Sequence, residues 1–305
     1  MNRRTYFKLA AGIGVGSISG CLSLDADSEA ARANIGDAVD LLQECDKYLI
    51  SKSEQFDSDT TKVVTFDEQY ITSRVSQARR KLDVAADTAS SSQMETVDAL
   101  HEAVDVYEPA ADVFAALATL INQMNNLDTD NLQSAQGLIR QMQTTYNPIP
   151  SQVDTTIKES NEVDGDLLAE KGIKWETTRA ELEEADVIIN DLGDSLDMLS
   201  ALIDGVIAIE DGTDALRDEN YAEADTDFSS AKASLEKSND ALARIESPEF
   251  FQSVSYEDLK CRILTLRDFS DDMAMGSRLA TEDNMSEARR KFREAADTID
   301  QSECY

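Results

Sequence analysis

Apolar residues recur every three or four positions along most of the chain, a spacing that predicts amphipathic helices. The clearest series runs from Leu182 to Val206 in alternating steps of three and four. It predicts a long helix whose apolar seam is covered by neighbouring helices of a bundle or, alternatively, by a second chain in a coiled coil. Alternating Val, Ile and Thr runs typical of strands are almost absent. We therefore predict an all-α fold, a multi-helix antiparallel bundle with long helices.

Shorter apolar series predict further helices separated by polar or proline-containing segments. The expected ranges are 29–56, 66–90, 93–126, 130–146, 151–162, 255–280 and 284–303. Pro109 should bend or interrupt the third of these, because proline lacks the N–H that a helix interior uses.

The clearest break is Asn147-Pro148-Ile149-Pro150, since a residue before proline is disfavoured in the helical conformation. It divides an N-terminal helical bundle, 34–147, from a C-terminal helical region, 148–305. Asp164-Gly165-Asp166 is expected to be a turn.

The first twenty-one residues form a separate unit. Arg3 and Arg4 precede a weakly apolar stretch, 9–18, which is too short for a membrane span of about 20 apolar residues. The paired arginines resemble a twin-arginine signal, which exports cargo that is already folded. Ile18-Ser19-Gly20-Cys21 resembles a lipobox, in which the cysteine after the cleavage site carries a lipid.

The resemblance implies a signal peptide over 1–20. The segment that follows is rich in small and acidic residues, so we expect a tether over 21–33. The resemblance also places the body outside the cytoplasm, on the outer face of the cell membrane, with membrane lipid as a partner through Cys21. The alternative is an uncleaved N-terminal helix that stays in the membrane.

The charge balance narrows the class of protein further. The chain has 61 acidic and 28 basic residues and a formal net charge of −33. Such a surface repels itself at low salt, and this repulsion largely vanishes in molar salt. The composition resembles that of proteins from halophilic archaea, and the signal resembles their twin-arginine lipoproteins. With 41% hydrophobic residues the chain should fold, and without a basic patch nucleic acid is not an expected partner.

Two C-terminal segments match at an offset of 64 residues. The shared positions are Gly212 and Gly276, Asn220 and Asn284, Glu223 and Glu287, Ala224 and Ala288, Phe228 and Phe292, and Ala231 and Ala295. Each asparagine is expected to cap a helix, with the glutamate three residues later reaching back to it.

The shared pattern resembles the tetratricopeptide repeat, a helix pair of about 34 residues. The spacing of 64 departs from that family, as does the lack of a closing proline, so an ordinary helical hairpin with the same packing is the alternative. The resemblance implies protein binding on a concave helical surface, here in a groove with Tyr221, Phe228 and Phe292.

Three cysteines follow Cys21. Cys261 and Cys304 lie about 21 residues to either side of the expected turn near 282–283, so an antiparallel hairpin rising about 1.5 Å per residue brings them level. We predict a disulfide between them. A bridge from Cys45 to either one, or free thiols, are the alternatives.

No motif in the sequence points to catalysis. His101 is the only histidine, and we expect it to be exposed or capping near a helix start. No C-x-x-C pair or His-based cluster occurs, so we expect no metal, no cofactor and no enzymatic activity. Asn284-Met285-Ser286 is the sole N-glycosylation sequon, and its asparagine is better explained as the helix cap.

These observations favour a lipid-anchored extracytoplasmic helical protein that binds or scaffolds an unidentified protein at the cell surface. The alternative is a lipoprotein that captures a solute or ion for a membrane transporter. A third possibility is an enzyme that uses only carboxylates.

Overall fold

A computed structural model describes residues 26–58, 63–127, 131–245, 255–302 and 304, and this part of the chain consists of helices joined by turns and short irregular segments, without strands. The predicted all-α fold is confirmed. Arg3, Arg4 and Cys21 lie outside the described residues. The helices are α1 Ala26–Ser58, α2 Glu68–Ala86, α3 Ser91–Asn125, α4 Leu132–Tyr146, α5 Ile149–Ser160, α6 Gly165–Glu170, α7 Trp175–Arg217, α8 Tyr221–Leu242, α9 Tyr256–Thr281 and α10 Met285–Asp300.

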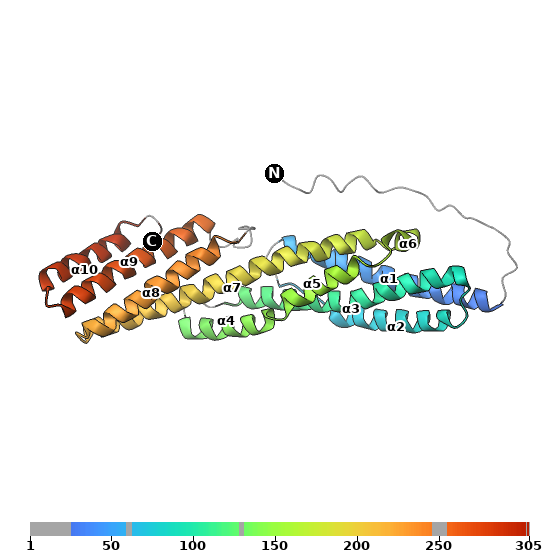
Figure 1. Cartoon of the computed structure of the whole chain (residues 1–305), viewed down its shortest axis with the longest axis horizontal. Coiled ribbons are helices and arrows are strands. Elements are labelled where there is room, and N and C mark those ends of the chain that lie inside the picture. Colours follow the sequence, from blue (N-terminus) through green and yellow to red (C-terminus); the bar gives the residue numbers. More distant parts are fainter. Residues whose placement is uncertain (1–25, 59–62, 128–130, 246–254, 303, 305) are drawn as a thin grey trace.

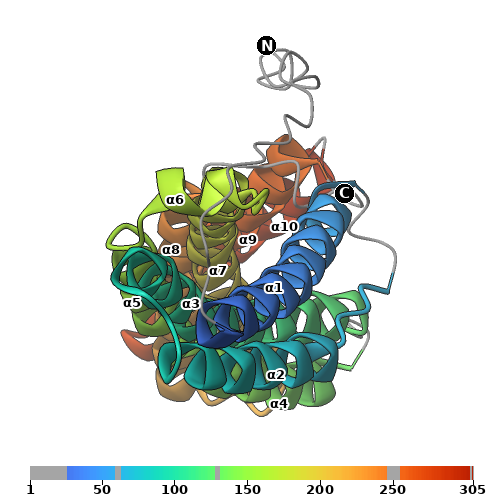
Figure 2. The same cartoon turned by 90° about the vertical axis from the view of Figure 1, so that its right-hand side faces the viewer.

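The described helices form an elongated body in which α7 runs through both halves (Figure 1). Helices α1 to α6 lie around the first part of α7. Helix α8 packs along its second part, α9 packs mainly against α8, and α10 packs against α9. Viewed end on, α7 lies among α1, α3, α5 and α6, whereas α2 lies on the outside against α1 and α3 (Figure 2). The 43-residue helix α7 therefore connects the two halves.

The larger apolar core lies in the N-terminal half. It takes buried residues from α1 to α7, among them Leu42, Leu82, Leu100, Phe114, Ile139, Val153, Leu168 and Leu192. The break is a turn at 147–148 between α4 and α5, and Ile149 and Val153 of α5 belong to the same core. The expected division at residue 148 thus does not separate two cores, because the larger core continues along α7 to Ile203.

The apolar seam of α7 is covered within the chain. Its buried members are Leu182, Ala185, Ile189, Leu192, Leu196 and Ile203. Beyond them, smaller clusters join α7 to α8 and α9, one around Met198 and Leu235 and another around Phe228 and Ala274. The bundle interpretation of the seam accounts for this packing.

Several local expectations need correction. Pro109 does not interrupt α3, because Tyr107, Ala110 and Ala111 are buried on either side and their packing offsets the missing hydrogen bond. The 21–33 segment is not a tether throughout, since α1 already begins at Ala26 and Ala31 is fully buried.

The turn expected at 164–166 is instead the start of the short helix α6, because the Asp164 side chain accepts a hydrogen bond from the backbone N–H of Leu167 and caps it. His101 lies inside α3 and not near its start. Its Nε2 is 3.6 Å from Asp83 Oδ1, so it faces α2 on the surface.

A buried carboxylate fixes the start of α7. Asp46 of α1 is 2% exposed and accepts a hydrogen bond from the backbone N–H of Lys174 at 2.7 Å. It also accepts from the hydroxyl of Tyr107 in α3 at 3.2 Å and from the hydroxyl of Thr178 in α7. Burial, with the Asp46 charge as the next cause, raises the pKa of Tyr107 well above its usual value, so the phenol stays a donor. The helix dipole adds favourable charge at this position.

Asp46→Ala should lower the free energy of unfolding by about 3 kcal/mol, because it leaves buried donors without an acceptor. Urea unfolding at fixed salt, followed by circular dichroism, measures the change. Asp40→Ala is the matched control, since Asp40 lies on the same helix and is exposed. Equal stabilities of the two variants would contradict a structural role for Asp46.

Candidate functional site in the C-terminal hairpins

The two matched segments form hairpins with the same turn. Glu219 between α7 and α8 has φ 58°, and Asp283 between α9 and α10 has φ 60°. The next backbone N–H donates back to the helix in both turns, from Asn220 to Ala215 O and from Asn284 to Leu279 O, each at 2.8 Å. This bond and the left-handed residue define a Schellman ending, which places the following helix antiparallel to the one before it.

A close contact between a glycine and a phenylalanine also recurs. A Cβ placed on Gly212 would lie 3.0 Å from the ring of Phe228, and one on Gly276 would lie 2.5 Å from the ring of Phe292. The glycines therefore let each ring lie directly against the preceding helix. The helix pairs are longer than 34 residues, and the likeness to tetratricopeptide repeats stays a prediction.

The predicted groove needs correction at one residue. Phe228 is fully buried and packs edge-on against Phe269 at 6.2 Å, so its ring belongs to the core and not to an open groove. The absence of a side chain at Gly212 leaves room for the Phe228 ring in the core. Tyr221 and Phe292 are partly exposed, and their role in a groove stays a prediction.

The side chains of Asn220 and Asn284 do not form the capping box expected from the sequence. Neither Asn220 nor Asn284 accepts a hydrogen bond from the backbone of its helix. Each side chain instead donates to the glutamate three residues on, and the Asn284 Nδ2 to Glu287 Oε2 distance is 3.2 Å. These contacts lie at the surface.

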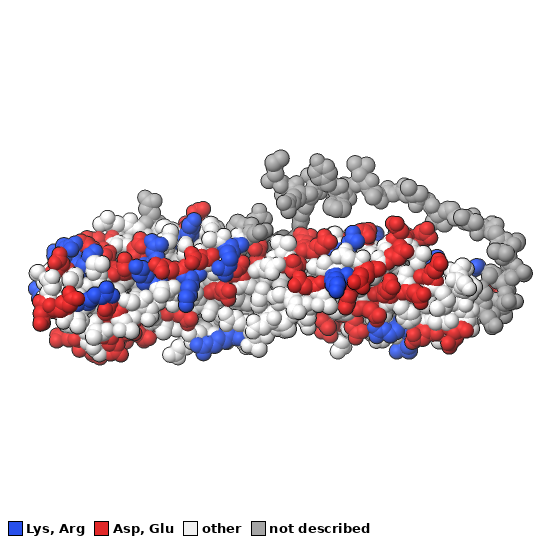
Figure 3. Space-filling view, in the orientation of Figure 1, with Lys and Arg blue, Asp and Glu red and all other residues white. Residues whose placement is uncertain are grey.

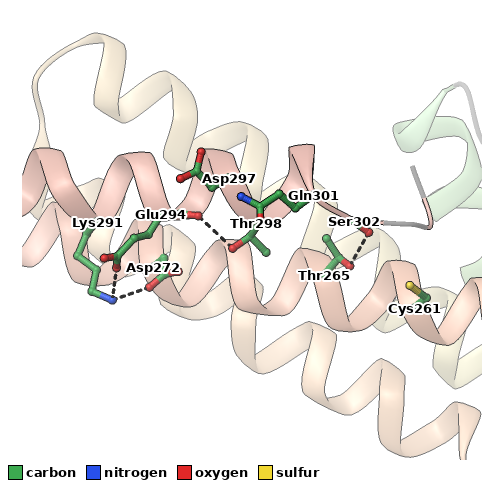
Figure 4. Close-up of a pocket in the computed structure, with 9 residues that line it drawn as sticks. All are labelled: Cys261, Thr265, Asp272, Lys291, Glu294, Asp297, Thr298, Gln301 and Ser302. Carbon is green, nitrogen blue, oxygen red and sulfur yellow. Dashed lines mark hydrogen bonds and ion pairs between the residues drawn. The ribbon is translucent and has the colours of Figure 1, made fainter.

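An open hollow of about 580 Å³ lies between α9 and α10 (Figure 4). The residues that line it are Cys261, Thr265, Asp272, Lys291, Glu294, Asp297, Thr298, Gln301 and Ser302. Its walls carry several charged and hydroxyl groups and no aromatic ring, so it suits a polar group better than an apolar one.

The only lysine that lines this hollow, Lys291, is paired with two carboxylates. Lys291 Nζ lies 2.8 Å from Asp272 Oδ1 of α9 and 2.8 Å from Glu294 Oε2 of its own helix. These hydrogen bonds raise the pKa of Lys291 and, with one from Arg290, lower the pKa of Glu294. Both groups stay charged near neutral pH, so the pair is not set up for general acid or base chemistry.

The disulfide closes the other end of the hollow. Cys261 and Cys304 are bonded, with Cα atoms 6.0 Å apart, as their level positions in the hairpin predict. Arg262 Nε donates to Cys304 O at 3.1 Å, and the hydroxyls of Thr265 and Ser302 lie 3.1 Å apart. The chain end is thus attached to α9.

Cys45 is a free thiol in the larger core, so it does not pair with either of these cysteines. Burial raises the pKa of the Cys45 thiol to about 12. A thiol with this pKa has little thiolate at neutral pH and is a poor nucleophile or metal ligand.

The surface is unevenly charged. In the view of Figure 3, Lys and Arg gather over the half formed by α8 to α10, whereas the other half is mostly acidic or uncharged. Over the described ranges, no group of three or more His, Cys, Asp or Glu is placed to hold a metal ion. None of the described helices is both long and apolar enough to cross a bilayer.

Sequence reasoning did not single out Asp46 or Lys291. Asp46 and Lys291 are each one charged residue among many. A signal for Asp46 does exist, because Leu42, Cys45 and Leu49 place position 46 on the buried stripe of α1. No such signal marks the hollow, which depends on side chains from two helices.

Comparison with known proteins gives no relative. No family model, no curated protein and no solved structure matches this chain.

Removing the disulfide by Cys261→Ser with Cys304→Ser should lower the free energy of unfolding by about 2–4 kcal/mol, because it frees a loop of 43 residues in the unfolded chain. Urea unfolding and protease cleavage near α10 measure the loss. Reducing the unsubstituted chain should give the same loss, and a reductant should not change the variant. Unaltered stability would mean that the hairpin packing alone holds α10.

Proposed function

We propose that the chain is a lipid-anchored extracytoplasmic helical protein that binds or scaffolds another protein at the cell surface. The observation that carries the proposal is the N-terminal series of Arg3, Arg4 and Cys21, in which an export signal ends at a cysteine suited to lipid attachment. The acidic surface supports a body that works in concentrated salt, as in halophilic archaea.

The arrangement of the body supports binding more than capture of a solute. The hollow between α9 and α10 is open, and its only lysine is held by two carboxylates. An elongated body with exposed hairpins offers length and surface to a protein partner. The C-terminal half carries a partly exposed tyrosine, Tyr221, and arginines, residue types that are enriched at protein interfaces. We place the partner contact on this half.

Cys21→Ser should release the body into the medium, because a thioether to lipid can no longer form. Membrane and medium fractions of a halophilic host that produces the full chain measure the distribution. Cys45→Ser is the matched control and should stay with the membrane, since its thiol is buried in the core. Retention of the Cys21→Ser chain in the membrane would refute the lipid anchor and favour an uncleaved N-terminal helix.

A photoreactive phenylalanine analogue at Tyr221 should cross-link the chain to one discrete extracytoplasmic protein in intact cells. The same analogue at Tyr70, a partly exposed tyrosine of α2 in the other half, is the control and should give no such product. Gel shift and mass spectrometry of the adduct identify the outcome. An adduct from Tyr70 alone would place the partner contact on the N-terminal half and contradict the proposed location.

A further inference from the structure

We propose that Asn284, in the turn between α9 and α10, is an acceptor for N-linked sugar. Asn284-Met285-Ser286 is the one Asn-x-Ser/Thr sequence in the chain with a residue other than proline in the middle. The inference rests on the proposed export, because the sugar transfer takes place outside the cytoplasm.

The turn presents the acceptor sequence at the surface. Asn284 is partly exposed, Met285 is 37% exposed and Ser286 is exposed. The α9–α10 turn lies at one end of the elongated body, well away from the start of α1 (Figure 1). A chain that crosses the membrane already folded can be modified only where the fold leaves the acceptor accessible, and this turn meets that condition.

The Asn284 side-chain amide makes no capping hydrogen bond to the backbone of α10. Its oxygen accepts no hydrogen bond from the backbone of α10, so the capping role expected from the sequence is absent. The amide nitrogen donates to Glu287 Oε2 at 3.2 Å, and Ser286 Oγ lies 3.4 Å from Asn284 Oδ1. Both contacts are exposed, and water can replace them at little cost.

The turn between α7 and α8 has the same geometry as the turn at Asn284 and serves as an internal control for this site. Asn220 follows a left-handed residue and bonds to a glutamate three residues on, as Asn284 does. Its backbone N–H donates across the turn at the same 2.8 Å. Position 222 is an exposed alanine where the second hairpin has Ser286. The two turns thus differ in the hydroxyl that completes the acceptor sequence.

The proposed reaction transfers a sugar to Asn284 from a lipid-linked sugar phosphate. The amide nitrogen of Asn284 forms a bond to the anomeric carbon of the sugar, and the bond from that carbon to the phosphate oxygen breaks. The nitrogen loses one proton, the lipid phosphate leaves with the bonding electron pair, and no oxidation or reduction takes place.

The test uses the full chain, produced in a halophilic archaeal host and recovered from the membrane. Peptide mass spectrometry should show a sugar mass on the peptide that contains Asn284. Ser286→Ala should abolish this mass, and Ala222→Ser should add a second one at Asn220. Ser286 and Ala222 are both exposed, so neither substitution disturbs the core.

Each outcome decides the proposal. An exported chain with an unmodified Asn284 overturns the inference and leaves the export proposal standing. A sugar on Asn284 that persists in Ser286→Ala also overturns it. A chain that is absent from the membrane and medium fractions instead refutes the export on which the inference rests. Arg3→Lys with Arg4→Lys should keep the chain in the cytoplasm without sugar.

Discussion

The structure depends on one buried carboxylate where three helices meet. Asp46 of α1 receives hydrogen bonds from α3 and from the first turn of α7, including the backbone N–H of Lys174. An ionised group is costly to bury, and it is tolerated here because donors converge on it and because it lies at the positive end of a helix. This contact joins the start of α7 to α1 and α3.

Helix α7, whose start is held by Asp46, extends into the other half of the molecule. Its first part shares the large core with α1 to α6, and its second part meets α8 through smaller clusters. Glycines on α7 allow side chains of its neighbours to come close. Gly193 faces the Tyr146 hydroxyl of α4, and a Cβ on Gly205 would lie 2.9 Å from the Leu235 side chain of α8. With the glycine–phenylalanine contacts, Gly205 shows that small residues let the C-terminal hairpins pack closely around small apolar clusters.

The sequence predicts those features that follow from local periodicity. Helix ranges such as 255–280 agree closely with α9, and the cysteine register is correct because a helix has a fixed rise per residue. Features that depend on distant partners could not be predicted. Pro109 stays within a helix because its neighbours are buried, and Phe228 leaves the expected groove because Gly212 makes room for it.

Ion pairs join neighbouring helices of the C-terminal half, in a chain whose net charge is −33. Lys232 pairs with Asp271 at 2.9 Å, Arg278 with Asp225 at 3.1 Å and Lys291 with Asp272 at 2.8 Å, so each contact joins one helix to the next. Exposed pairs contribute about 0–1 kcal/mol each and weaken in concentrated salt. Salt therefore removes much of their attraction together with the general repulsion between carboxylates. The Gly276–Phe292 contact and the Cys261–Cys304 bond do not depend on charge, so they continue to hold α10 to α9 when the salt concentration is high.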